Sequence, residues 1–292
     1  MNIAQALSQA AGLGVARLDG QLLLLHALGR AQHERAWLLA HDMDELGVDV
    51  ESAFTSLCNR RATGEPLAYL TGHKEFFGLD LLVDKRVLVP RPDTETLVEW
   101  ALALLGCHPG LDPGSTAWTP GQARGDKLLV IDLGTGSGAI ALAVKHACPG
   151  ARVEAVDASS DALEVARANA QRLNLDIRFR QASWLTGAAG PYDLILSNPP
   201  YVIQDDPHLA ALTHEPLCAL ASGPDGLDDI RQIVSQAPAH LKSGGWLLLE
   251  HGYDQADAVQ SLLAMAGFRE ITGRRDLAGI TRCTGGKWLE LG

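Results

Sequence analysis

From residue 128 onward, short apolar segments alternate with longer segments of helical periodicity. The segments expected to be strands are Leu128 to Leu133, Arg152 to Val156, Ile177 to Gln181, Leu194 to Ser197 and Trp246 to Glu250. The expected helices are Ala139 to Cys148, Ser160 to Leu173, Asp229 to Leu241 and Gln255 to Ala266, and the tail adds one or two strands. Such alternation predicts an α/β, doubly wound parallel sheet that binds ligands at the carboxyl ends of its strands.

The first ninety residues follow other patterns. Residues 2 to about 64 show helical spacing, for example at Leu18, Leu22, Leu25 and Leu28. Extended runs follow over 75–90, with Asp84-Lys85 expected as the turn of a hairpin. We therefore predict three parts: a helical bundle (1–72), a β-hairpin linker (73–92) and the doubly wound domain (93–292). Within the last part, residues 106–126 hold five glycines and three prolines and are expected to form a mobile loop.

The composition is that of an ordinary globular protein. Of the 292 residues, 47% are hydrophobic and 20% are charged, and no apolar run is long enough to span a bilayer. The N-terminus has no signal-like segment, so a cytoplasmic location is expected. The five cysteines are odd in number and widely spaced, which favours reduced, mostly buried thiols over disulfides or a zinc cluster, and no metal is expected.

The net charge of the chain is −11. Nucleic-acid-binding domains usually carry a basic face, whereas the overall field of this chain would repel phosphate. The charge therefore favours a protein or small-molecule substrate.

A glycine-rich segment, Asp132 to Gly138, closes the first predicted strand of the sheet and opens a helix. Its glycines allow a tight turn and a close approach of a ligand to the backbone. A dinucleotide site could share this loop, but the spacing is G-x-G-x-G rather than G-x-G-x-x-G. Asp157 closes the next strand, where it could accept hydrogen bonds from ribose hydroxyls. The pattern favours an S-adenosylmethionine site of the class I methyltransferase type.

The sequence Asn-Pro-Pro-Tyr at 198–201 directly follows a predicted strand. The side-chain oxygen of Asn198 and a carbonyl of the stiff Pro199-Pro200 step can accept hydrogen bonds from the two N–H bonds of a planar NH₂ group. The ring of Tyr201 can cover the flat face of that group. The motif predicts methyl transfer to an amide or exocyclic amino nitrogen.

Further segments make the chain similar to the bacterial release factor glutamine methyltransferase family (the PrmC/HemK type) over nearly its whole length. The resemblance rests on Pro66 to Tyr69, Glu75 to Leu79, Val89 to Glu95, Asp132 to Gly138, Asn198 to Tyr201, Glu215-Pro216, Gly223 to Leu227 and Leu249 to Gly252. Two departures are Ser183, where family members often have an acidic residue, and Asp93, where Glu is more usual.

The resemblance implies an N-terminal bundle that grips the substrate, a hairpin linker and a Rossmann-like methyltransferase domain. We expect the protein to be a monomer. The resemblance also implies N5-methylation of the glutamine in the Gly-Gly-Gln loop of class I peptide chain release factors, with S-adenosylmethionine as the methyl donor. The residues it implies for the cofactor are Gly134, Thr135, Gly136, Ser137, Gly138, Asp157, Trp184 and Asn198. Asp132 could cap the helix or face the cationic methionine end of the cofactor, and we count it among the cofactor residues. The residues that the resemblance implies for the glutamine amide are Asn198, Pro199, Pro200 and Tyr201.

Two other functions share part of this pattern. A methyltransferase acting on nucleobase amino groups could carry the same Asn-Pro-Pro-Tyr motif, although stable binding of nucleic acid is not expected from the charge. A non-catalytic protein that kept the fold is the third hypothesis, and the intact motif and glycine loop argue against it.

Overall fold

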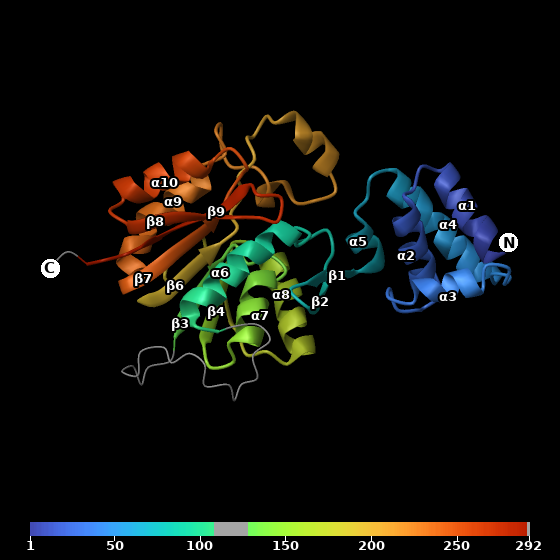
Figure 1. Cartoon of the computed structure of the whole chain (residues 1–292), viewed down its shortest axis with the longest axis horizontal. Helices are drawn as coiled ribbons and strands as arrows, with labels where there is room; N and C mark the ends of the chain where they lie inside the picture. The colour runs from blue at the N-terminus through green and yellow to red at the C-terminus, as the bar shows by residue number, and fades with distance from the viewer. Residues whose placement is uncertain (108–127, 291–292) are drawn as a thin grey trace. The chain divides into compact units, whose positions relative to one another are not determined.

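The computed structural model describes residues 1–107 and 128–290 (Figure 1). The chain divides into two compact units, Met1–His73 and Lys74–Gly292. The loop predicted over 106–126 lies, from residue 108 on, outside the described residues. None of the described helices is long and apolar enough to cross a membrane.

The first unit consists of five helices around its own apolar core. They are α1 (Ile3–Gly12), α2 (Arg17–Ala27), α3 (Arg35–Ala40), α4 (Val48–Ala62) and α5 (Leu67–Thr71). Asn2 and Gln5 form a capping box that begins α1. The buried face of α2 carries Leu23, Leu24 and Leu25, whereas Leu18 is about half exposed. The predicted helices are present, but the apolar face of α2 is shifted from the expected leucine repeat.

The hairpin turns earlier than predicted. Its strands are β1 (His73–Phe76) and β2 (Leu79–Leu82), so the turn is formed by Phe77 and Gly78. Both residues have a positive φ, as a tight two-residue hairpin turn requires. Asp84 instead accepts hydrogen bonds from Arg86 within a local turn, and 86–89 is not a strand. The prediction that Asp84-Lys85 forms the turn of the hairpin is therefore wrong.

The second unit is built on a seven-stranded sheet with the order β5-β4-β3-β6-β7-β9-β8. Its strands are β3 (Leu129–Leu133), β4 (Arg152–Asp157), β5 (Arg178–Gln181), β6 (Tyr192–Ser197), β7 (Leu241–Glu250), β8 (Arg269–Arg275) and β9 (Thr281–Lys287). The first five strands in the sheet order are parallel, and β9 runs antiparallel to β7 and β8. The prediction of a doubly wound parallel sheet is confirmed, with the tail adding two strands.

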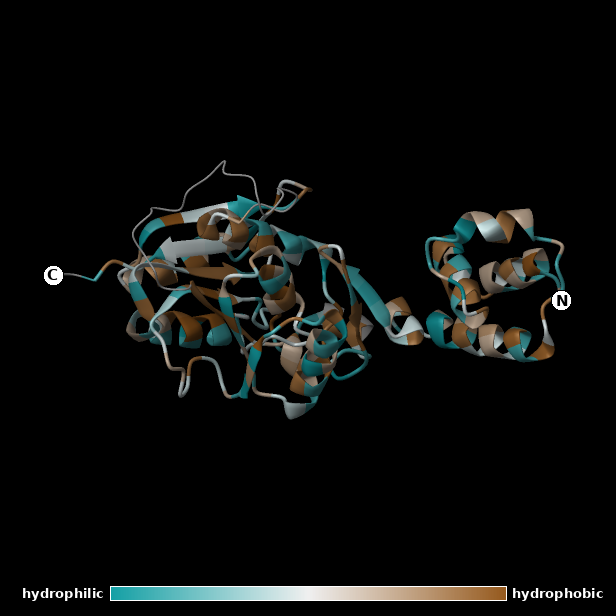
Figure 2. Cartoon of the chain, turned by 90° about the horizontal axis from the view of Figure 1, so that it is seen from below, coloured by the Kyte–Doolittle hydropathy of each residue, from teal (hydrophilic) through white to brown (hydrophobic). Residues whose placement is uncertain are grey.

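Alternate side chains of each central strand enter two different cores. Val130, Leu194 and Leu248 belong to a core with α6 (Glu95–Leu105), α7 (Ala139–Ala147) and α8 (Ser160–Leu173). The second core contains Ile131, Ile195, Leu247 and Leu249, together with side chains of α9 (Asp228–Gln236) and α10 (Ala256–Met265). Figure 1 shows these helices around the sheet, and Figure 2 shows hydrophobic colour on some of the strands and hydrophilic or neutral colour on others. The sheet is therefore covered on both faces.

The short elements complete the second unit. They are the 3₁₀ turns η1 (Pro92–Thr94), η2 (Pro207–Leu212), η3 (Leu217–Ala219) and η4 (Ala237–His240). The helix expected over 229–241 ends at Gln236, because Pro238 lacks an N–H and the chain tightens into η4 before β7 begins at Leu241.

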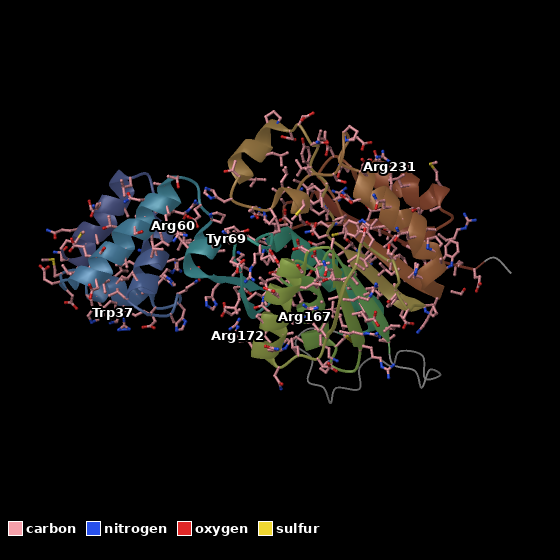
Figure 3. The ribbon with its side chains drawn as sticks, turned by 180° about the vertical axis from the view of Figure 1, so that it is seen from behind. Trp37, Arg60, Tyr69, Arg167, Arg172 and Arg231 are labelled. Atoms are coloured by element: carbon pink, nitrogen blue, oxygen red, sulfur yellow. A yellow bond between two sulfur atoms is a disulfide. The ribbon has the colours of Figure 1, made fainter. Side chains whose placement is uncertain are left out.

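A buried asparagine fastens the hairpin to this unit. Asn169 on α8 is fully buried; its side chain accepts a hydrogen bond from the Leu82 backbone N–H at 2.7 Å and donates to the Leu82 carbonyl at 2.9 Å. It also donates to the carbonyl of Ser137 in the glycine loop at 3.0 Å. Arg172, one helical turn further along α8 and labelled in Figure 3, pairs with Asp80 of β2 at 3.1 Å. Through α8, the hairpin and the glycine loop are held as one structure.

Two cysteines depart from the prediction of reduced thiols. Cys107 and Cys148 form a disulfide, with their Cα atoms 5.8 Å apart. Cys107 follows α6 and Cys148 ends α7, and these two helices pack side by side, so a separation of 41 residues in sequence becomes a contact in space. Cys58 and Cys283 are free and buried, and Cys218 is free and exposed.

We predict that Gly285→Ala destabilises the second unit by about 1–3 kcal/mol through overpacking. A Cβ at this position of β9 would lie 2.4 Å from Leu248 and 2.8 Å from the ring of Trp100. Gly150→Ala is the control, because a Cβ there would meet no atom within 4 Å. Denaturant unfolding of both variants measures the difference, and equal stabilities would contradict the packing described for this face.

Candidate active site

Four residues from adjacent strands form a row at one edge of the sheet. The parallel registers pair Val156 with Leu133, Leu133 with Ser197, and Ser197 with Leu249. The next residue on each strand is therefore Asp157, Gly134, Asn198 and Glu250, respectively. Because parallel strands share one direction, all four lie at the carboxyl edge, where doubly wound sheets bind ligands. The cofactor motif and the Asn-Pro-Pro-Tyr motif are thus neighbours in space.

The glycine loop turns sharply between β3 and α7. Gly134, Gly136 and Gly138 all have a positive φ, which costs glycine little and other residues more. A Cβ on Gly134 would lie 3.2 Å from the ring of Trp184, and one on Gly138 would lie 3.0 Å from Leu142. The loop therefore needs glycine for its conformation and also, at these two positions, for space.

Asp157 is joined to the glycine loop. Its carboxylate accepts hydrogen bonds from the backbone N–H groups of Gly136 and Ser159, both at 2.9 Å. Burial raises the pKa of this carboxyl, although hydrogen bonds from Ser159 and Gly136 oppose the rise. The carboxylate lies at the end of β4, where it can also accept hydrogen bonds from a diol.

Asp132 lies beneath the loop and is fully buried. One carboxyl oxygen, Oδ2, accepts hydrogen bonds from the Thr135 hydroxyl at 2.6 Å and the Ala141 N–H at 3.2 Å. The other oxygen, Oδ1, has no hydrogen-bond partner among the described residues. Burial raises the pKa of this group to about 7. An unpaired buried oxygen of this kind suits a ligand that brings a hydrogen-bond donor or a positive charge.

A cavity of about 270 Å³ opens beside the row. Of the residues predicted to form the site, those that line it are Gly134, Gly136, Asp157, Trp184, Asn198 and Pro200. Thr135 and Ser137 are buried and, with Asp132, Gly138, Pro199 and Tyr201, do not line the cavity. Ser183 lines it and is exposed. The structure thus brings five of the predicted cofactor residues, Asn198 among them, to a single cavity, and the others lie within the glycine-rich segment beside it.

The four residues of the Asn-Pro-Pro-Tyr motif leave β6 and turn back towards the loop that follows. Asn198 donates a hydrogen bond from Nδ2 to the hydroxyl of Thr94 at 3.1 Å. The N–H of Tyr201 donates to the Leu220 carbonyl at 3.2 Å, and the Tyr201 carbonyl accepts from Gln255 at 3.1 Å. These bonds hold both ends of the proline pair.

Charged side chains lie near Tyr201. Burial raises the pKa of its hydroxyl to about 12, and Glu250 adds to the rise, while Arg282 and Arg91 oppose it. Arg282 also pairs with Asp93 at 3.4 Å. The phenol therefore stays neutral at physiological pH and cannot act there as a phenolate base.

A buried carboxylate joins two cavity walls. Glu215 accepts hydrogen bonds from the Val89 N–H at 3.1 Å and from the Arg91 guanidinium at 2.5 Å, and its side chain is only 3% exposed. The same cavity is lined by residues 86–88, which precede Val89, and by residues 216, 218 and 219, which follow Glu215. The segment after the hairpin and the loop after Tyr201 are thereby fixed to each other.

Sequence reasoning assigned no role to several residues of this site. It missed the wall formed by Arg86, Val87 and Leu88, and it gave no part to Thr94 or Glu250. The available signal was position: Glu250 ends a predicted strand, and residues at strand ends gather at the ligand-binding edge. Among the residues that the structure describes, no group of three or more His, Cys, Asp or Glu is arranged to hold a metal ion.

Two family models match the chain. Residues 2–72 match the PrmC N-terminal domain, and residues 104–219 match the methyltransferase small domain. Among solved structures, the catalytic domain of human Mettl16 in complex with an RNA hairpin has a TM-score of 0.56, with 16% identity over 80% of this chain and 82% of that chain. A methyltransferase from Pyrococcus furiosus has a TM-score of 0.52, with 19% identity over 73% of this chain and 91% of that chain. At these identities the structures support the class I methyltransferase fold alone.

Curated relatives cover nearly the whole chain. Proteins named release factor glutamine methyltransferase are 47% identical in Bordetella pertussis (94% of this chain, 95% of the relative) and 44% identical in Pseudomonas aeruginosa (94% and 93%). The Escherichia coli protein of that name is 38% identical (98% and 97%). With this identity over both units, the chain belongs to the release factor glutamine methyltransferase family.

Proposed function

We propose that this protein transfers a methyl group from S-adenosylmethionine to the side-chain amide nitrogen (N5) of the glutamine in the Gly-Gly-Gln loop of class I peptide chain release factors. The observation that carries the proposal is the row formed by Asp157, Gly134 and Asn198, which joins a cofactor loop to an amide-binding motif at one cavity. Membership of the release factor glutamine methyltransferase family supports a release factor glutamine as the substrate.

The cavity has features that suit the methyl donor, which supplies an electrophilic methyl group on a sulfonium. Asp157 would accept hydrogen bonds from the ribose hydroxyls, and the ring of Trp184 offers a flat surface for the adenine. The glycine loop admits the ligand close to the backbone. The unpaired Oδ1 of Asp132 would receive a donor or positive charge from the methionine end.

The acceptor half would orient a poor nucleophile. An amide nitrogen has its lone pair delocalised into the carbonyl, so it reacts when it is held in line with the methyl group in a water-excluded site. Hydrogen bonds from its two N–H groups to Asn198 Oδ1 and to a carbonyl of the proline pair would point the lone pair at the methyl and favour positive charge on nitrogen. The carbonyl oxygens of Pro199 and Pro200 accept no hydrogen bond from the described residues. The methylated nitrogen is far more acidic than the amide and releases its proton afterwards, so no strong base is required.

The first unit would dock the release factor. It corresponds to the PrmC N-terminal domain. Its exposed apolar side chains include Leu39 at 64%, Met43 at 72% and Val48 at 81% of their full exposure. Exposed apolar residues of this kind suit contact with a protein partner. Methyl transfer to nucleobase amino groups is the alternative, and neither the net charge of −11 nor the curated relatives favour it.

Incubating the pure enzyme with labelled cofactor and an unmethylated class I release factor is predicted to place one methyl group on the Gly-Gly-Gln glutamine. Mass spectrometry of the tryptic peptide measures it. The control is a release factor with that glutamine replaced by alanine, which should remain unlabelled. Transfer to RNA or DNA, with none to the release factor, would support the alternative function instead.

The Asn198→Ala variant is predicted to lower turnover by about 100-fold or more, because it removes an acceptor that orients the substrate amide. Affinity for the cofactor should fall only modestly, which calorimetry can measure. Asn59→Ala, an exposed position on α4, is the matched control. Unchanged turnover in Asn198→Ala would show that this side chain does not orient the acceptor.

The Asp157→Ala variant is predicted to weaken cofactor binding by about 10-fold or more, as expected when hydrogen bonds to a charged acceptor are lost. Titration calorimetry with S-adenosylhomocysteine gives the affinity without turnover. Asp161→Ala, an exposed carboxylate in the first turn of α8, serves as the control for charge. Equal affinities of the two variants would exclude Asp157 from the cofactor site.

A further inference from the structure

The amide of Asn198 could present either of two groups to the cavity. Its oxygen accepts hydrogen bonds and its NH₂ donates them, and a half-turn of the terminal torsion exchanges the two. A substrate NH₂ group needs the oxygen. Whatever holds the other end of the amide therefore decides whether the site can bind its substrate productively.

Thr94 lies on the NH₂ side of Asn198. It ends η1, just before α6, and is 4% exposed. Its hydroxyl accepts a hydrogen bond from Nδ2 of Asn198 at 3.1 Å. A hydroxyl that accepts one bond still has its own hydrogen to donate.

Glu250 lies beside both residues. It follows Leu249 in β7 and so stands next to Asn198 in the row at the sheet edge. It is 1% exposed, and burial raises its pKa to about 7, whereas hydrogen bonds with Thr94 and Asn198 lower the pKa. Its Oε2 atom has no hydrogen-bond partner among the described residues. A buried carboxyl with an unpaired oxygen is costly to the fold, which points to a role in the site.

The two contacts leave one part of the Asn198 amide unused. Thr94 accepts the hydrogen bond from the NH₂ group, and Glu250, next to Asn198 in the row, interacts electrostatically with the same side chain. The carbonyl oxygen Oδ1 accepts no hydrogen bond from the part of the chain that the structure describes, and Asn198 lines the cavity. Reversing the amide would set its oxygen against the carboxyl of Glu250, and the repulsion between two acceptors disfavours that orientation.

We propose that Thr94 and Glu250 are positioning residues that hold the NH₂ group of Asn198 and so direct its carbonyl oxygen to the substrate amide. This inference rests on the proposed function, because it assumes an acceptor nitrogen with N–H bonds. Neither residue needs to touch the substrate. Asp93, the neighbour of Thr94, pairs with Arg282 on β9 at 3.4 Å.

The test compares Thr94→Val with Thr94→Ser. Valine keeps the size but loses the hydroxyl, so kcat is expected to fall about 10-fold, the size of one lost hydrogen bond at the reacting geometry. Serine restores the hydroxyl and should recover most of the loss. Cofactor affinity should remain unchanged in both variants. Thr71→Val, which removes a buried hydroxyl bonded to backbone carbonyls in the first unit, is the control for a structural effect.

A double-mutant cycle with Asn198→Ala separates positioning from general damage. If Thr94 acts through the amide of Asn198, then adding Thr94→Val to Asn198→Ala lowers kcat no further. Independent effects that multiply would overturn the proposal. The same cycle applies to Glu250, for which Glu250→Gln, with an oxygen that still accepts, should retain more activity than Glu250→Ala. Circular dichroism and cofactor binding identify any variant that has failed to fold. If Thr94→Val or Glu250→Ala fails to fold, the conservative variants Thr94→Ser and Glu250→Gln are each compared with the wild-type protein instead.

The outcomes separate the two proposals. If the wild-type protein methylates the release factor and Thr94→Val has the wild-type kcat, the positioning role is wrong and the proposed function stands. If the wild-type protein methylates no release factor, the proposed function fails, and the inference that rests on it fails as well. A loss of kcat that depends on an intact Asn198, with rescue by serine, supports both.

Discussion

The parallel register of β4, β3, β6 and β7 is the constraint on which the site depends. It places Asp157, Gly134, Asn198 and Glu250 in one row, although Gly134 and Glu250 are 116 positions apart in the sequence. Backbone hydrogen bonds fix this row, and two cores, one on each face of the sheet, bury its strands. A shift of one residue in any register would move a polar group from the edge and reverse the faces of that strand.

The segments above the row are held by buried polar side chains rather than by the sheet. Asn169 fastens the hairpin and the glycine loop, and Glu215 joins the segment before α6 to the loop that follows Tyr201. Loops alone are mobile and place side chains poorly. These few hydrogen bonds, made where water is excluded, let loop residues form walls of the cavity with a defined geometry.

Several features could be read from the sequence because they depend on local chemistry. The strand and helix pattern, the glycine loop and the end of β6 before Asn198 all follow from periodicity and from residues with special backbone preferences. The predictions were wrong where the structure of a segment depended on its contacts with other parts of the fold. Asp84 and Lys85 look like a turn, but Phe77 and Gly78 adopt the positive φ values of the hairpin turn, and Asp84 pairs with Arg86 instead. Cys107 and Cys148 read as separate thiols until α6 and α7 pack together.

The type of fold, the two motifs of the candidate site and, through resemblance, the family could all be inferred from the order of the residues. This was possible because each motif is a short run of residues whose chemistry does not need the rest of the chain. Which residues surround those motifs depends on how the whole domain folds. Thr94 lies before α6 and Glu250 lies at the end of β7. Their proposed role becomes visible only in the folded domain, where both lie beside the amide of Asn198. Hydrogen bonds between distant segments depend on the packing of the whole domain, and no local pattern in the sequence records them.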